Sequence, residues 1–337
     1  MNKFKYSGFS LSTLHQNGKH GFAISYSMML YAKNSLYTFI PKNACSTLRL
    51  STAIENGCIE CVEQGHWIHA NNQTFNATLG EALKVDYSFV VLRCPFRRLA
   101  SVYLDKFVAK EPDAWQYREN LQRKVELDDL TFRDFVLSLK NPAIFNSNIH
   151  WRKQGDFLLF EEYSDYFALE KFSDAIGILK EKIDFNVVDA RSLTNHGTHH
   201  YQMLTESCFA DTSTFDIAVM KRQGQCPSHA ALYDKSLYAL VSELYQSDIQ
   251  LYKDKCKASD LLSIDEVVSP ILDINTVTLA DIQYHFDVDF LRDEAVRLES
   301  TDLSLAFKLM GLALEARPDG PFIKQKYEEY AHLLQKA

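Results

Sequence analysis

The sequence of 337 residues lacks an apolar run long enough to cross a lipid bilayer, because a spanning helix needs about 20 mostly apolar residues. The nearest candidate, residues 21–32, is short and interrupted by serines. The N-terminus also lacks an apolar segment followed by a cleavage site of small residues, so no signal peptide is evident. We therefore expect a cytoplasmic protein without a transmembrane segment.

Positive charge and regularly spaced cysteines are scarce as well. The chain has 36 Lys and Arg against 44 Asp and Glu, a net charge of −8, which argues against general nucleic-acid binding. Its seven cysteines are irregularly spaced, as is typical of reduced thiols in a cytosol. Cys58 and Cys61 have metal-ligand spacing, but no second pair accompanies them. We expect no metal site.

The most informative segment is a lysine-containing turn between a strand and a helix. Leu36–Ile40 is a short β-favouring run, Pro41 ends it, and Lys42 follows directly. Residues with helical spacing come next, and we expect Ser46 or Thr47 to cap that helix, whose first N–H groups form an anion site. The turn lacks the glycines of the common nucleotide loop G-x-x-x-x-G-K-[ST], which disfavours an ordinary ATPase or GTPase.

A second segment with the same character lies about fifty residues further on. Tyr87–Leu92 is a continuous apolar run, typical of a strand buried in a parallel sheet. Arg93 stands at its end, and Pro95 occupies the expected first position of a helix. Ligands of open α/β sheets bind beyond the carboxyl ends of the strands. Lys42 and Arg93 are therefore expected to converge on one polyanion.

Together, segments 41–49 and 93–101 resemble the two cofactor signatures of carbohydrate sulfotransferases. These enzymes use 3′-phosphoadenosine 5′-phosphosulfate (PAPS) and release adenosine 3′,5′-bisphosphate. The resemblance implies that Arg93 and Ser101 bind the 3′-phosphate, although Cys94 replaces the aspartate usual in the family. It also implies that the 5′-phosphosulfate is held by six consecutive residues: Lys42, Asn43, Ala44, Cys45, Ser46 and Thr47.

The resemblance covers roughly residues 36–253 and implies an α/β fold, a P-loop-like central parallel sheet flanked by helices. We expect a sulfotransferase domain over residues 1–257, with a further strand at Asp156–Phe160, a helix at Phe172–Ile183 and a closing helix at Leu232–Tyr252. Many animal members of the family carry an N-terminal Golgi anchor. Because no such segment is evident, a bacterial origin fits better.

Residues 258–337 differ in character and are expected to form a C-terminal helical extension. Apolar residues recur with helical spacing over Thr301–Ala316 and again after Pro321, which predicts an antiparallel helix pair. The pair is similar to a single tetratricopeptide-type unit, and one unit cannot form a solenoid. It is expected either to cap the catalytic domain or to serve for protein docking or self-association.

Sulfuryl transfer resembles phosphoryl transfer in being governed by positioning and charge stabilisation. Lys42 is suited to stabilise the leaving group, and no metal is needed. A hydroxyl acceptor also requires a base. The segment Asn148–Gln154 resembles the family segment in which a histidine followed by tryptophan lies near the acceptor, so His150 is expected to be the base. His69 is the competing candidate, and His150 with Trp151 could instead be structural.

The leading hypothesis is a PAPS-dependent sulfotransferase acting on a hydroxyl of a carbohydrate. A catalytically inactive glycan- or partner-binding protein on the same fold is the alternative from another class. A nucleotide-dependent kinase is disfavoured, because it needs an acidic metal-binding pair near Lys42 and Arg93 occupies that strand end. The acceptor sugar is not readable from the sequence. Candidates for a basic patch around the donor and acceptor are Arg93, Arg97, Arg98, Lys106, Arg152 and Lys153.

Overall fold

The computed structural model describes residues 3–8, 11–71, 73–190, 200–267 and 288–336. Its centre is a four-stranded sheet in the order β1-β2-β3-β4. β2 pairs parallel with β3, and β3 pairs parallel with β4, whereas β1 pairs antiparallel with β2 at one edge. The strands are β1 Ser27–Leu30, β2 Ser35–Thr38, β3 Tyr87–Leu92 and β4 Asp165–Ala168. The expected α/β fold with a helix-flanked sheet is confirmed.

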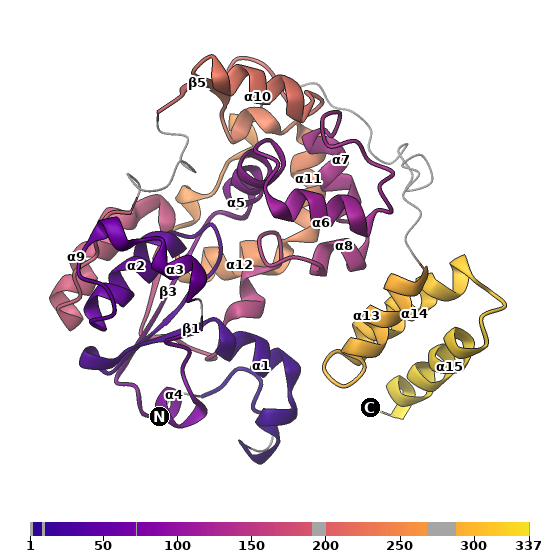
Figure 1. Cartoon of the computed structure of the whole chain (residues 1–337), viewed down its shortest axis with the longest axis horizontal. Helices are drawn as coiled ribbons and strands as arrows, with labels where there is room; N and C mark the ends of the chain where they lie inside the picture. Colours follow the sequence, from indigo (N-terminus) through magenta and orange to yellow (C-terminus); the bar gives the residue numbers. More distant parts are fainter. Residues whose placement is uncertain (1–2, 9–10, 72, 191–199, 268–287, 337) are drawn as a thin grey trace.

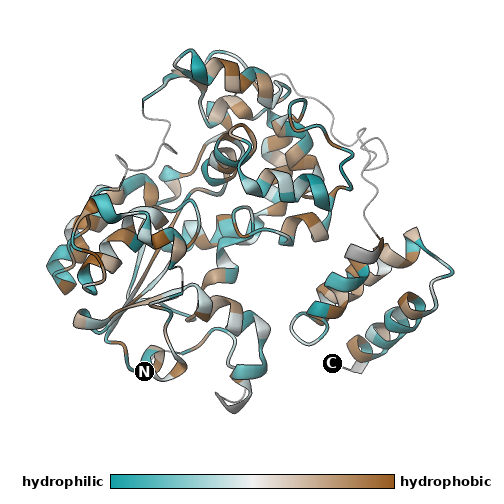
Figure 2. Cartoon of the chain, in the orientation of Figure 1, coloured by the Kyte–Doolittle hydropathy of each residue, from teal (hydrophilic) through white to brown (hydrophobic). Residues whose placement is uncertain are grey.

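Alternate residues of the strands enter two separate apolar cores, one on each face of the sheet. Leu36 and Val90 face the core that also contains residues of the helices α1 and α4, while Tyr37 and Phe89 face the core formed with α2 and α9. Figure 1 shows these helices on opposite sides of the sheet, and in Figure 2 the strands are mainly apolar while α6 is mainly hydrophilic. A sheet covered on both faces explains the continuous apolar run of β3.

Helices precede, connect and follow these strands. Those in the first half of the chain are α1 Gly18–Ser25, α2 Cys45–Glu55, α3 Trp67–Ala70, α4 Leu79–Lys84, α5 Pro95–Val102, α6 Pro112–Asn120, α7 Phe132–Ser138 and α8 Pro142–Asn146. A π-helical turn, Tyr103–Phe107, continues α5. The later ones are α9 Phe172–Ile183, α10 Thr214–Arg222, α11 Lys235–Leu244, α12 Gln246–Lys255, α13 Val288–Leu298, α14 Leu303–Ala316 and α15 Pro321–Lys336.

Two predicted elements differ from the structure. The strand expected at Asp156–Phe160 is wrong, because this segment begins as a 3-10 turn (Gln154–Phe157) and Phe160 forms only an isolated bridge with Phe4. Its apolar residues instead pack into the core on the face of the sheet that α1 and α4 cover. The closing helix expected at Leu232–Tyr252 is divided at Tyr245 into α11 and α12.

A third apolar core lies among the helices beside the carboxyl edge of the sheet. It joins α5, α7 and α11 around large aromatic side chains, including the buried Trp151 and Tyr233. The chain between α9 and α11 adds a small parallel sheet, β5 Gln202–Leu204 with β6 Gln225–Pro227, connected through α10. This helical layer lies next to the strand ends from which Lys42 and Arg93 emerge.

The C-terminal helices have an apolar core of their own. Phe307 of α14 stacks on Tyr327 of α15 with ring centroids 4.6 Å apart, and α13, which the sequence did not reveal, completes the group. Ala143 of α8 joins this core, and Lys19 forms an ion pair with Asp302 at 3.0 Å. Within the described residues, no helix is both long and apolar enough to span a membrane.

Candidate active site

The turn after β2 presents Lys42 in an unusual backbone conformation. Lys42 (φ 73°) and Ala44 (φ 56°) both lie in the left-handed region, which is uncommon outside glycine and clusters at functional turns. Ala44 occupies the N-cap of α2 and makes no side-chain capping bond. The expected cap by Ser46 or Thr47 is therefore wrong, since both lie within the first helical turn. An α2 N-terminus without a side-chain cap suits a bound anion.

The parallel pairing of β2 and β3 brings the second predicted loop to the same edge. Thr38 is in register with Val90, so Lys42 and Arg93 emerge side by side. Arg93 donates a hydrogen bond from Nη1 to the Lys42 carbonyl oxygen at 2.9 Å. Burial lowers the pKa of the Arg93 guanidinium to about 10, which leaves it charged at neutral pH. Ser101 lies further along α5 and is half-buried.

The substituted position of the second signature is buried in the helical core beside this edge. Cys94 is fully buried. Its Sγ accepts a hydrogen bond from the Leu262 backbone N–H at 3.3 Å, and its own N–H donates to Glu170 at 3.0 Å. The side chain that replaces the family's aspartate therefore packs into the interior, and the replacement leaves Arg93 in place.

Lys42 begins a continuous series of charged side chains. Its Nζ lies 2.8 Å from Oδ2 of Asp105, which also lies 3.4 Å from Nζ of Lys106. Lys106 in turn lies 3.5 Å from Asp113 at the start of α6. The π-helical turn carries both Asp105 and Lys106, and such turns are frequent at functional sites. Burial lowers the pKa of Lys42, and the Asp105 carboxylate opposes that shift.

The series ends at the predicted base. Oδ1 of Asp113 lies 3.0 Å from Nδ1 of His150, and the Asn148 amide donates to the same carboxylate oxygen at 2.7 Å. Asn148 Oδ1 also lies 2.9 Å from His150 Nδ1. Both oxygens that face Nδ1 are acceptors in this network, so Nδ1 carries the proton. This tautomer leaves the lone pair on Nε2, as a general base requires.

The pKa shifts in this pair support a neutral imidazole next to an ionised carboxylate. Burial lowers the pKa of His150, and the hydrogen bond and charge of Asp113 oppose that effect. Burial would raise the pKa of Asp113, but hydrogen bonds from His150 and Asn148 outweigh it and hold the pKa well below its usual range. His150 is therefore unprotonated at neutral pH and able to accept a proton.

The neighbouring Trp151 has the structural role that the sequence left open. It is buried, donates from Nε1 to the Ile144 carbonyl oxygen at 2.7 Å, and packs edge-on against Phe135. The competing histidine, His69, lies on α3 and is exposed. Only His150 of these two is joined to Lys42 by the charged series described above.

A buried amide holds the two loops together. Oε1 of Gln154 accepts hydrogen bonds from Asn43 Nδ2 at 2.6 Å and from the Arg93 N–H at 3.0 Å, and its Nε2 donates to the Arg93 carbonyl oxygen at 2.8 Å. The Gln154 N–H donates to Asp248 of α12 at 2.6 Å. Gln154 is 1% exposed, so none of these groups has water as an alternative partner.

The candidate basic patch divides into different roles. Arg98 is buried and structural, since it donates to the backbone carbonyls of Pro41, Ile149 and Arg152. Arg97 pairs with Glu266 at 3.1 Å. Of the six expected cations, Arg93 bonds to the Lys42 carbonyl oxygen and Lys106 shares the Asp105 carboxylate with Lys42.

Sequence reasoning missed three residues of this site. Asp105 and Asp113 are separated from Lys42 and His150 by 63 and 37 positions in sequence, so no periodicity links them. His229, after β6, is the third. Burial and the charges of Arg93, Arg97 and Lys42 lower its pKa to about 3, so it lies within the electrostatic field of the two loops. Within the described residues, no group of three or more His, Cys, Asp or Glu is arranged to hold a metal ion.

Comparison with known proteins agrees with this geometry. The model of the sulfotransferase family matches residues 27–253, a span that contains both loops, the charged series and His150. The chain therefore belongs to the sulfotransferase family. Neither the comparison with curated proteins nor that with solved structures gave a significant match.

The Gln154 network yields a stability prediction. Gln154→Leu should lower the free energy of unfolding by roughly 2–4 kcal/mol, because the Arg93 N–H and one of the two N–H groups of the buried Asn43 amide lose their acceptor, while the other Asn43 N–H keeps the Val91 carbonyl oxygen. Chemical denaturation measures this loss. Gln250→Leu, on the exposed face of α12, is the matched control and should change stability by less than about 0.5 kcal/mol. Equal effects of the two substitutions would contradict the proposed role of the network.

Proposed function

We propose that the protein transfers the sulfuryl group of PAPS to a carbohydrate hydroxyl, with Lys42 at the donor and His150 as the base. The observation that carries this proposal is the continuous contact series from Lys42 through Asp105, Lys106 and Asp113 to His150. It supports the proposal because it joins the loop proposed to bind the donor to a histidine whose Nδ1 faces two acceptors, as the proposed base requires. The carbohydrate class of the acceptor rests on the resemblance of segments 41–49 and 93–101.

The residues at the sheet edge fit a donor with several negative charges. Lys42 and Arg93 are adjacent cations, and the uncapped N-terminus of α2 adds the positive end of a helix dipole. In the proposed arrangement, residues 42–47 bind the phosphosulfate and Arg93 with Ser101 binds the 3′-phosphate. Arg93 is suited to this role because a guanidinium forms paired hydrogen bonds with phosphate oxygens.

The bound donor supplies an activated sulfuryl group whose transfer leaves negative charge on the 5′-phosphate. Lys42 Nζ, released from Asp105 or shared with it, stabilises that charge together with the N–H groups of α2. His150 Nε2 accepts the proton of the acceptor hydroxyl. Asp113 holds the Nδ1–H and stabilises the imidazolium that results, as the buried carboxylate does in hydrolase triads.

Two alternatives remain testable against this proposal. A kinase would use acidic metal ligands near Lys42, but the carboxylate next to Lys42, Asp105, is already ion-paired with both Lys42 and Lys106. An inactive binding protein would retain donor affinity without transfer.

The deciding experiment incubates the protein with PAPS and defined glycans and determines sulfated products by mass spectrometry. A thermal shift with adenosine 3′,5′-bisphosphate, but not with ATP and magnesium, supports the donor assignment, and absence of transfer to every glycan overturns the proposed activity.

Lys42→Ala should lower kcat by about 10²–10³-fold, because a charge interaction at the leaving group is lost. Removing Lys42 also leaves Asp105 with one cation fewer, so Lys42→Ala/Asp105→Asn should be tested beside it. Product formation over time measures turnover, and circular dichroism measures whether each variant is folded. Near-normal turnover in either folded variant would remove Lys42 from the mechanism.

Arg93→Ala and Ser101→Ala should weaken binding of adenosine 3′,5′-bisphosphate more than binding of adenosine 5′-phosphate. The arginine contact is charge-assisted and is expected to contribute roughly 1.5–3 kcal/mol. Calorimetry with both ligands measures the difference. Equal losses for the two ligands would show that these residues do not recognise the 3′-phosphate.

Asp113→Asn should lower kcat by roughly 10²–10⁴-fold, since the preferred imidazole tautomer and the stabilisation of the imidazolium are lost. Asp113 raises the pKa of His150, so its removal lowers that pKa further. The acidic limb of the kcat/KM profile should therefore move to lower pH in this variant. His150→Ala should abolish most transfer while preserving donor affinity.

The exposed His69→Ala is the matched comparison for the base assignment. It should retain wild-type transfer and pH dependence. If His69→Ala is inactive while His150→Ala works normally, His150 is not the base. An acidic limb that stays in place in Asp113→Asn would show that the titration of His150 does not control the reaction.

A further inference from the structure

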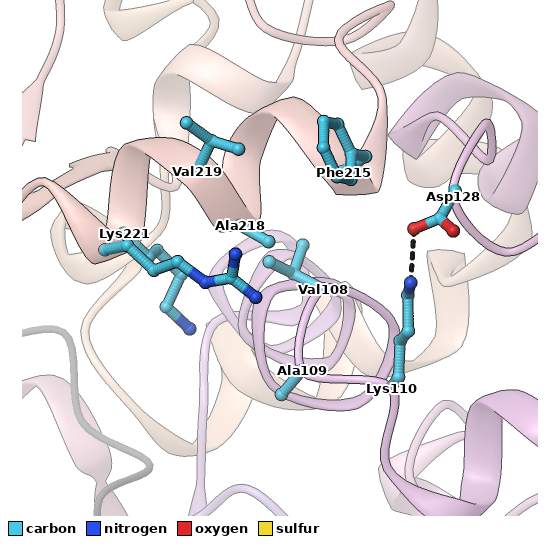
Figure 3. Close-up of a pocket in the computed structure, with 9 residues that line it drawn as sticks. Val108, Ala109, Lys110, Asp128, Phe215, Ala218, Val219 and Lys221 are labelled. Carbon is cyan, nitrogen blue, oxygen red and sulfur yellow. Dashed lines mark hydrogen bonds and ion pairs between the residues drawn. The ribbon is translucent and has the colours of Figure 1, made fainter.

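A cavity of about 370 Å³ lies between α10 and the turn that follows the π-helical segment. Figure 3 shows Phe215 and Val108 among the residues that line it. None of the lining residues forms one of the contacts described above for Lys42, Arg93 or His150. The C-terminal helices α13–α15, in contrast, contact α1 and α8, and Figure 1 shows them on the side of the molecule where those two helices lie.

The contact with α8 leads directly to the proposed base. Ala143 of α8 is buried in the apolar core of the C-terminal helices, together with Leu309 of α14. The carbonyl oxygen of the next residue, Ile144, accepts the hydrogen bond from the Trp151 indole at 2.7 Å. Because Trp151 directly follows His150 in the sequence, α8 links the C-terminal core to the residue beside the proposed base.

The contact with α1 depends on a glycine. Gly18 is the first residue of α1 and does not have a positive φ, so its backbone conformation does not require glycine. A Cβ atom on Gly18 would, however, lie 2.1 Å from Cγ2 and 2.5 Å from Cβ of Thr301, in the turn between α13 and α14. Rotation of the Thr301 side chain cannot relieve the second contact, because Cβ is fixed to the backbone. The adjacent Lys19 pairs with Asp302 at 3.0 Å.

α1 in turn supports the chain two residues after the proposed base. The guanidinium carbon of Arg152 lies 4.3 Å from the centre of the Phe22 ring of α1, and Phe22 packs edge-on against Phe157 at 5.0 Å. Arg152 also lines a cavity of about 10 Å³ together with Leu298 of α13. A cavity of this size holds about one water molecule, so the C-terminal helices fit closely against this part of the chain.

We propose that the C-terminal helices act as a brace that holds His150 in position, with Gly18 as a positioning residue that admits Thr301. The contact itself is independent of the proposed function, whereas its catalytic consequence rests on that function. Asp248 of α12 holds the backbone N–H of Gln154 without help from the C-terminal helices. Loss of the brace should therefore loosen the chain around His150 more than the loops after β2 and β3.

Hydrogen exchange of the full-length protein tests the brace without any substrate. Gly18→Ala should raise the exchange of residues 142–157 and of residues 288–316, because the new methyl group displaces Thr301. Addition of Thr301→Gly to this variant should restore the exchange, because it removes both atoms that the methyl group meets. Gly21→Ala is the matched control on the same helix, since a Cβ atom there has open space, and it should behave as wild type.

Lys19→Glu disturbs the same contact from an exposed position and leaves both apolar cores intact. It replaces the ion pair with Asp302 by repulsion, so it should act in the same direction as Gly18→Ala but more weakly. Unchanged exchange of residues 142–157 in both variants, or failure of Thr301→Gly to restore it, overturns the brace.

Catalysis provides the second readout. In Gly18→Ala, kcat for sulfate transfer from PAPS to a glycan that the wild type modifies should fall about tenfold, with an unchanged Kd for adenosine 3′,5′-bisphosphate. The loss is limited because Arg98 still holds the carbonyls of Ile149 and Arg152. An unaltered kcat despite raised exchange would show that the brace does not position His150. If the wild type transfers sulfate to no glycan, the proposed function fails, while hydrogen exchange still decides whether the brace exists.

Discussion

The position of the Gln154 segment determines the geometry of the whole site. Its buried side chain bonds to Asn43 in the loop after β2 and to Arg93 in the loop after β3, and Asp248 of α12 fixes its backbone. Arg98 ties the carbonyls of Ile149 and Arg152 in the same segment to that of Pro41. Because His150 lies between those two residues in the sequence, the contacts that align the two loops also set the distance from the loops to His150.

The charged series then couples the two ends of the site electrostatically. Two lysines alternate with two aspartates, and the series ends on a neutral imidazole. Partly buried charges are tolerated only when they are paired, so each member depends on its neighbours. A bound anion that draws Lys42 away from Asp105 leaves Lys106 as the compensating cation. The π-helical turn places Asp105 and Lys106 on consecutive positions. Asp105 can therefore exchange Lys42 for Lys106 as its ion-pair partner without a rearrangement elsewhere in the chain.

The sequence predicted those parts of the fold that local pattern determines. The apolar run of β3, the proline at the start of α5 and the helix Phe172–Ile183 are all present, and the parallel pairing of β2 with β3 brings Lys42 to Arg93 as expected. The strand proposed at Asp156–Phe160 failed because a short apolar run can equally fill a core without pairing. Asp105, Asp113 and His229 escaped notice because their importance comes from tertiary contacts.

The electrostatic field at this edge of the sheet suits the proposed binding of a polyanion by an acidic protein, and it acts on His229. Lys42, Arg93 and Arg97 are concentrated at one edge of the sheet, and together with burial they depress the pKa of His229 to about 3. His229 is therefore neutral at pH 7 when these cations act on it alone. A polyanionic donor would oppose their field and raise this pKa, because nearby negative charge favours the protonated imidazole. In the proposed complex, a more negatively charged donor thus favours protonation of His229, which adds positive charge next to the donor.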